Sequence, residues 1–167
     1  KCYVLRSMEF GYSTVQSGDQ HTQSLYRENP YEALMITGDE SLVNAETVIQ
    51  YRIINPKDYL FNASNAENTL KIAAQASIRR VVANHTMDEV LTAQKDIIQS
   101  EILQDLEYVC TNIYQLGVDI TQVYLQAVYA PLEVEEAFND VIKAREDRSR
   151  FINEANKSRN EIIPAAE

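Results

Sequence analysis

The side chains that could do chemistry are few, and they are scattered along the sequence. Only two histidines are present, His21 in a polar stretch and His85 just before an expected helix. A hydrolase brings a nucleophile, a base and an orienting group together, and neither histidine lies in a pattern that supplies such a set. We therefore interpret His85 as a helix-end residue, and we predict no catalytic residue.

Motifs of the common catalytic, nucleotide-binding and metal-binding sites are also missing from the sequence. It contains no Gly-x-Ser-x-Gly elbow, no phosphate-binding loop and no His-Glu-x-x-His zinc motif. Glu133, Glu135 and Glu136 follow Pro131, where a helix is expected to begin. Consecutive side chains diverge around a helix, so we interpret these acids as complementing the helix dipole. We predict neither a metal nor a cofactor.

The cysteines and the overall charge exclude further classes of protein. Cys2 and Cys110 are too few for a disulfide framework or a zinc cluster. Cys110 belongs to an apolar helical series with Leu106 and Ile113, which predicts a small core residue. Twenty-five acidic and fifteen basic residues give a formal net charge of −10. Because this charge repels phosphate backbones, we predict no nucleic-acid partner.

The hydrophobic runs are too short for a membrane span. A spanning helix needs about 20 apolar residues, whereas the longest runs here, such as Ala33 to Ile36, are the length of a strand. Lys1 opens a pattern typical of the middle of a strand, so we expect the chain to be a fragment. Any attachment to a membrane would then come from a segment absent from this chain.

Alternating patterns predict the strands. Residues 1–12 alternate, with Cys2, Val4, Met8 and Phe10 on one face and Tyr3, Ser7 and Glu9 on the other. Residues 13–29 are polar and are expected to form a loop. A second strand is expected at 32–37, a tight turn at 38–40, and a further strand at 118–129. In that last strand Val123, Leu125 and Ala127 are expected to face away from Gln122, Tyr124 and Gln126.

The clearest pattern runs from Leu42 to Ile54. One face is expected to carry Val43, Ala45, Thr47, Ile49, Tyr51 and Ile53, and the other Asn44, Glu46, Gln50 and Arg52. This alternation is typical of an antiparallel sheet that is covered on one side and wet on the other.

Cap residues predict the helices. Asn55-Pro56 begins a short one, a longer one follows Asn65, and residues 86–89 form a capping box. A further helix is expected over 94–116, ended by Gly117. The order of elements favours an α+β fold, a small antiparallel sheet with helices packed on one face, followed by a long charged C-terminal helix. We expect a domain over residues 1–129 and the start of an extended coiled-coil-type helix over 130–167.

The final helix carries a heptad-like seam. Alternating steps of four and three residues predict the assembly positions Val134, Phe138, Val141, Arg145, Arg148 and Ile152, followed by Ala155. Three flanking ion pairs are possible: Glu146–Arg150, Asp147–Arg150 and Glu154–Lys157. The sequence leaves two interpretations open, a helix that packs beside copies of itself and a solvated helix with a short docking stripe.

Two blocks of sequence resemble a known family. The first is Leu34 to Glu40 with Val48 to Arg52 and Pro56 to Asn62, and the second runs from Leu125 to Ala155. Both are similar to the HflK branch of the SPFH family, also called Band 7 or prohibitin-homology. Stomatins and prohibitins share its fold but usually lack the Thr-Gly-Asp-Glu turn and the Ala-Arg-Glu-Asp-Arg block present here. Residues 13–29 match nothing in the family.

The resemblance implies a membrane scaffold without an active site. Members of this branch have one N-terminal transmembrane helix and lie on the periplasmic face of the bacterial inner membrane. They assemble with an HflC-like partner into large oligomers that restrain the membrane AAA protease FtsH. This chain departs from them in lacking the transmembrane helix and the membrane-proximal first strand, and in ending where the long helix continues. The alternatives are another Band 7 protein that organises lipid or a channel, and a hydrolase with an unrecognised site.

Overall fold

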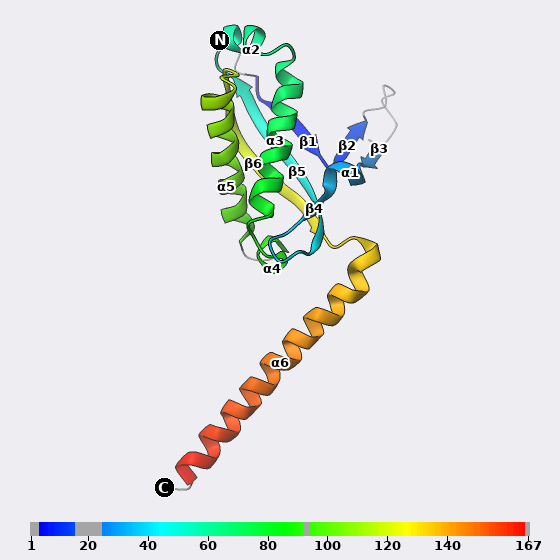
Figure 1. The fold of residues 1–167 in the computed structure, drawn as a ribbon, viewed down its shortest axis with the longest axis vertical. Helices are drawn as coiled ribbons and strands as arrows, with labels where there is room; N and C mark the ends of the chain where they lie inside the picture. The colour runs from blue at the N-terminus through cyan, green and yellow to red at the C-terminus, as the bar shows by residue number, and fades with distance from the viewer. Residues whose placement is uncertain (1–3, 16–24, 92–93, 166–167) are drawn as a thin grey trace. The chain divides into compact units, whose positions relative to one another are not determined.

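The computed structural model describes residues 4–15, 25–91 and 94–165 (Figure 1). The chain forms two compact units, Lys1–Tyr129 and Ala130–Glu167. The first unit has a four-stranded antiparallel sheet with helices, and the second is a single helix, α6 (Leu132–Ala165). The predicted α+β class, with a small sheet followed by a long helix, is confirmed.

The central strand of the sheet is β5 (Leu42–Ile53). It pairs with β6 (Val118–Tyr129) along one edge, and with β1 (Arg6–Phe10) and β4 (Leu34–Ile36) in turn along the other. The residues expected to face the core are buried from Val43 to Tyr51. Two helices, α3 (Ala66–Val82) and α5 (Lys95–Tyr108), lie on this face of the sheet (Figure 1).

Side-chain caps begin the helices as the sequence predicts. The carbonyl oxygen of the Asn55 side chain accepts a hydrogen bond from the amide of Lys57 at the start of α2 (Pro56–Phe61). At the start of α4 (Met87–Leu91), the Thr86 amide donates to the Glu89 carboxylate at 2.7 Å, and the Glu89 amide donates to the Thr86 hydroxyl at 3.4 Å. The bond from the Thr86 amide lowers the pKa of the Glu89 carboxyl, and the reciprocal pair of bonds confirms the capping box.

The helix predicted over 94–116 is shorter than expected. The α-helix ends at Tyr108 and passes into a π-helical turn, η1 (Val109–Ile113), so Leu116 lies beyond it. Gly117 has the predicted left-handed conformation, with a φ of 63°, but it does not end the helix: the cap is Tyr114, and the residue after it, Gln115, is itself left-handed with a φ of 49°. A β-carbon on Gly117 would lie 2.5 Å from the carbonyl oxygen of Asn55, so only glycine fits. Cys110 is buried, as predicted.

The N-terminal part of the chain differs from the prediction. The first strand ends at Phe10, because Gly11 turns the chain with a φ of 82°. The ends of the predicted loop form two paired strands, β2 (Tyr12–Val15) and β3 (Leu25–Glu28), which we call the β2–β3 ribbon. The ring of Tyr12 stacks on that of Tyr26 at 5.2 Å, a contact that favours the pairing. Cys2, Tyr3 and residues 16–24 lie outside the described residues.

The second predicted strand is also shorter than expected. Its first two residues belong to a short helix, α1 (Pro30–Ala33), and only Leu34–Ile36 pair as strand β4. The reason is Pro30, whose fixed φ is suited to the first position of a helix. The following turn forms as expected, with the amide of Thr37 donating to the carbonyl of Ser41 at 3.0 Å.

The second face of the sheet was predicted to be exposed to solvent, but part of it is covered. Glu46 is only 6% exposed, because the β2–β3 ribbon places Tyr26 against it. Ala127 does not share the face of Leu125 either. The β5–β6 register skips Gln126 and Thr121 as β-bulges, so Ala127 lies opposite Glu46 and is on its face. The strict alternation assumed for β6 is therefore wrong beyond Leu125.

Candidate functional site

His85 lies between two carboxylates rather than in a catalytic arrangement. Its Nε2 is 2.8 Å from an oxygen of Glu101 on α5, and its Nδ1 is 3.5 Å from an oxygen of Glu89 on α4. The side chain is 14% exposed. It connects the segment between α3 and α4 to both α4 and α5, and it lies next to a helix end, as expected. His21 lies outside the described residues. Residues 4–15, 25–91 and 94–165 contain no cluster of three or more potential metal ligands.

The remaining candidates for chemistry are not organised as a reactive site. Cys110 is buried, and burial raises the pKa of its thiol to about 12. The thiolate is the nucleophilic form, so this thiol is unreactive at neutral pH. Glu136 is exposed on α6, while the side chains of Glu133 and Glu135 lie outside the described part of the structure.

A buried carboxylate joins the β2–β3 ribbon to the sheet. The Tyr26 hydroxyl on β3 donates a hydrogen bond to the carboxylate of Glu46 on β5. Burial raises the pKa of Tyr26, and the hydrogen bond and negative charge of Glu46 raise it further. The hydroxyl of Tyr129, on β6, also interacts with Glu46. This cluster is suited to a structural role, because its hydrogen-bond donors and its acceptor satisfy one another.

The predicted seam falls within α6. Val134, Phe138, Val141, Arg145, Arg148 and Ile152 all belong to this one helix. Val141 is 49% exposed and Ile152 51% exposed, while the side chains of Phe138 and Arg145 lie outside the described part. Of the expected flanking pairs, Asp147–Arg150 forms at 2.8 Å.

Arg150 has a second neighbour on the same helix. Its guanidinium carbon lies 5.4 Å from the centre of the Phe151 ring, a cation–π contact. Arg150 is therefore engaged by its own helix, through Asp147 and Phe151. The exposed apolar residues Val141 and Ile152, in contrast, leave hydrophobic surface open on the predicted seam.

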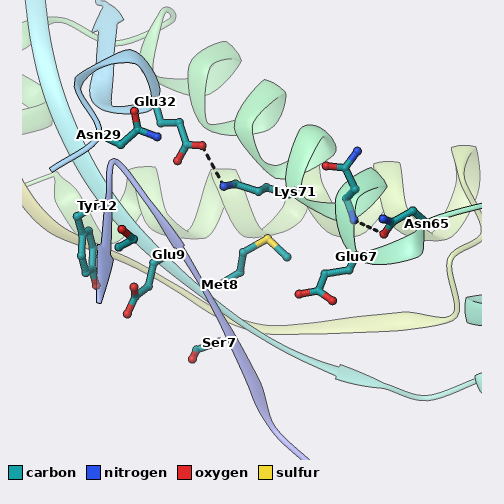
Figure 2. A pocket seen from close by; sticks show the side chains of 11 residues that line it. Ser7, Met8, Glu9, Tyr12, Asn29, Glu32, Asn65, Glu67 and Lys71 are labelled. Carbon is teal, nitrogen blue, oxygen red and sulfur yellow. Dashed lines mark hydrogen bonds and ion pairs between the residues drawn. The ribbon is translucent and has the colours of Figure 1, made fainter. Parts of the chain in front are cut away.

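One cavity of the first unit was not predicted from the sequence. It is a cleft of about 740 Å³ between β1, α1 and the first turns of α3 (Figure 2). Its lining is mainly polar, with Met8 as the exception: Ser7, Met8, Glu9, Tyr12, Ser13, Asn29, Glu32, Asn65, Glu67, Asn68 and Lys71. Within it, Lys71 Nζ lies 2.9 Å from Glu32, and Asn65 caps α3 by accepting from the Asn68 amide at 3.0 Å.

The helices described in the structure offer no membrane span. None of them combines the length and the apolar character that crossing a bilayer requires.

The SPFH domain / Band 7 family matches residues 14–162 of this chain. Among curated proteins, the chain is 40% identical over 133 residues to Protein HflK of Vibrio cholerae and 36% identical over 140 residues to Modulator of FtsH protease HflK of Escherichia coli K12. It is 35% identical over 161 residues to Protein HflK of Treponema pallidum.

These alignments cover 80%, 84% and 95% of this chain, respectively. They cover 33%, 33% and 48% of the relatives, so the chain spans about a third to a half of their length. The family match nevertheless includes the sheet from β5 onward, the helices that cover it and most of α6. The chain belongs to the SPFH domain / Band 7 family and is similar to its HflK members.

Proposed function

We propose that this chain is the assembly domain of an HflK-like, membrane-associated scaffold that regulates a membrane protease of the FtsH type. The observation that carries the proposal is its similarity, over most of its length, to proteins named HflK, one of which is named a modulator of FtsH protease. The proposed place of the whole protein is the periplasmic face of a bacterial inner membrane, with an HflC-like partner. The mechanism is restriction of access to the protease by many assembled copies, without catalysis.

The arrangement of potential catalytic groups supports a scaffold over an enzyme. His85 is held by two carboxylates, and the thiol of Cys110 is buried. Peptidase and esterase assays on the purified chain should therefore give background rates only. Turnover that co-purifies with the chain and is lost in His85→Ala would contradict a purely structural role.

The proposed assembly element is the seam of α6. Phe138 occupies a central seam position, and an aspartate there would place an unpaired charge in a packed contact. Arginines at the seam positions 145 and 148 weaken a simple hydrophobic zipper. We therefore expect the isolated chain to be a monomer or a weak oligomer at micromolar concentration, and the full-length protein with an HflC-like partner to form a large assembly.

Sedimentation velocity of the full-length protein with its partner tests the seam. Phe138→Asp should shift the distribution toward small species. Arg150→Ala is the matched control on the same helix, because Arg150 is off the seam and engaged by Asp147 and Phe151. The same assemblies should be assayed for protection of a membrane substrate from an FtsH-type protease. If Phe138→Asp assembles and protects as well as the unchanged protein, the seam lies elsewhere and α6 is only a spacer.

A further inference from the structure

The six basic residues of α6 fall into two groups. Three of them lie off the seam at intervals of seven residues, and each has an aspartate or a glutamate three positions before it: Lys143, Arg150 and Lys157. Residues three apart are neighbours on the surface of a helix. The guanidinium of Arg150 lies 2.8 Å from the carboxylate of Asp147, and the ammonium group of Lys143 lies 3.8 Å from that of Asp140. The off-seam bases are thus placed beside acids of their own helix.

The other three basic residues lie on the seam, and α6 places no acid beside them. They are Arg145, Arg148 and Arg159, the last of which continues the seam four residues beyond Ala155. The positions three and four residues before and after each of these arginines contain no aspartate or glutamate. Acids one or two positions away point to other sides of the helix. Arg148 and Arg159 are exposed, so they are available to carboxylates of another molecule.

A second copy of α6 does not supply the missing acids. Two helices that pack along such a seam bring together the seam positions and the positions that flank them. The flanking positions are Glu135, Ala137, Ile142, Ala144, Ser149, Phe151, Asn156, Ser158 and Ile163. Glu135 is the one acid among these nine residues, against three arginines on the seam. In a parallel pair in register, each seam arginine would lie opposite its own copy, and like charges at a packed contact disfavour it.

We propose that the seam of α6 binds a helix of a different protein, one that carries aspartate or glutamate opposite the three seam arginines. Arginine suits this contact, because its guanidinium donates two parallel hydrogen bonds to a carboxylate. The apolar seam positions supply the packing, while the arginines disfavour a second copy and select the acidic partner. This rests on the proposed function only in taking the seam as the contact surface, and it adds which residues choose the partner.

Two fluorescein-labelled peptides that differ only at the seam arginines test this selection. Both span residues 132–163; one is unchanged, and the other, the acidic peptide, carries Arg145→Glu, Arg148→Glu and Arg159→Glu. Each is titrated with the purified chain at low ionic strength and followed by fluorescence anisotropy. The acidic peptide should bind about tenfold or more tightly than the unchanged one. The formal net charge of the chain, −10, favours the opposite order, so this preference would come from the seam and not from overall charge.

Variants of the chain locate the contact. Arg148→Gln should weaken binding of the acidic peptide about fivefold or more. Arg150→Gln is the matched control, because it removes the same charge from the same helix but off the seam, and it should bind as the unchanged chain does. Circular dichroism and melting temperature establish that both variants fold. Conversely, a chain in which all three seam arginines are replaced by glutamate should prefer the unchanged peptide over the acidic one.

Three outcomes would overturn the proposal. The first is equal or tighter binding of the unchanged peptide, which would show that the seam pairs with its own copy. The second is the absence of any anisotropy change with the acidic peptide up to the highest soluble concentration of the chain. The third is equal weakening by Arg148→Gln and Arg150→Gln, which would place the contact off the seam. The proposed function is decided separately, by the sedimentation of Phe138→Asp, because assembly through the seam can persist with a partner of another chemistry.

Discussion

Replacing the Tyr26 hydroxyl should loosen the β2–β3 ribbon from the sheet. Tyr26→Phe removes a donor from the Glu46 carboxylate, which is only 6% exposed. A hydrogen bond to a charged group contributes about 1.5–3 kcal/mol. Tyr26 itself is 51% exposed, so water can partly replace its hydroxyl. We therefore expect the free energy of unfolding to fall by about 1.5 kcal/mol, at the lower end of that range.

A double-mutant cycle isolates this contact. Glu46→Gln keeps an acceptor oxygen but removes the charge, and its coupling to Tyr26→Phe should be about 1 kcal/mol. Urea unfolding followed by circular dichroism gives the four free energies, and hydrogen exchange should report faster opening of residues 25–28. Tyr124→Phe is the control, because Tyr124 is exposed on β6 and its hydroxyl has no hydrogen-bond partner in the described part of the chain. Its cost should stay below about 0.5 kcal/mol.

The same contact predicts a dependence on alkaline pH. Burial first, and then Glu46, raise the pKa of Tyr26 above its value of about 10 in the unfolded chain. The stability linked to this raised pKa is fully present below about pH 10 and is lost as the pH rises through the folded-state pKa. This alkaline loss should be smaller in Tyr26→Phe. If Tyr26→Phe and Tyr124→Phe unfold at the same urea concentration, or if the cycle is additive, Glu46 is satisfied without Tyr26 and the reasoning is wrong.

Three further predictions concern the core and the turns. Ile49→Ala, at a position 1% exposed, should cost roughly 2–5 kcal/mol by opening a cavity, whereas Gln50→Ala should cost little; equal melting temperatures would refute the assignment of faces. Asp39 accepts from the Thr37 hydroxyl at 2.6 Å and the Met87 amide at 3.1 Å, and although burial alone would raise its pKa, these bonds lower it. Asp39→Asn should therefore lower the free energy of unfolding by about 1 kcal/mol at neutral pH. In urea titrations this difference from the unchanged chain should shrink below about pH 4, because protonation of Asp39 then removes the same contribution from the unchanged chain. Gly117→Ala should cost at least about 2 kcal/mol in thermal unfolding, because its β-carbon would meet Asn55; an unchanged melting temperature would show that the turn relaxes.

Elements whose signals are local could be predicted from the sequence. The alternation from Leu42 to Ile53 requires only period two over a long strand, and the predicted strand and the observed one differ by one residue. The capping box at Thr86 and Glu89 depends on residues three apart, and both of its hydrogen bonds form. Gly117 has the predicted left-handed conformation, although the helix before it already ends at the cap residue Tyr114.

Features that depend on distant residues could not be predicted. The β2–β3 ribbon lies in polar sequence, and one of its stabilising contacts is Tyr26 with Glu46, twenty residues away. The burial of Glu46 in turn could not follow from alternation, which assigns it to a solvated face. The seam of α6 was predicted from spacing alone, and its role in assembly remains a prediction. The cleft at β1 was missed because the residues that line it come from three separate stretches of the chain.

The two bulges of β6 make the burial pattern of this strand insensitive to certain changes in length. Buried positions fall on even numbers at Val118 and Ile120 and on odd numbers at Val123 and Leu125. The half-buried Val128, which lies opposite the buried Ala45, is again even. Each bulge therefore reverses the parity of the core positions. Loss of the bulge residue Gln126 would join Leu125 to Ala127 and leave every side chain on its present face. Loss of a residue between the bulges would instead invert one flank of the strand. Length variation among relatives is thus expected to collect at the bulges, where a strand of the same core can be one residue shorter.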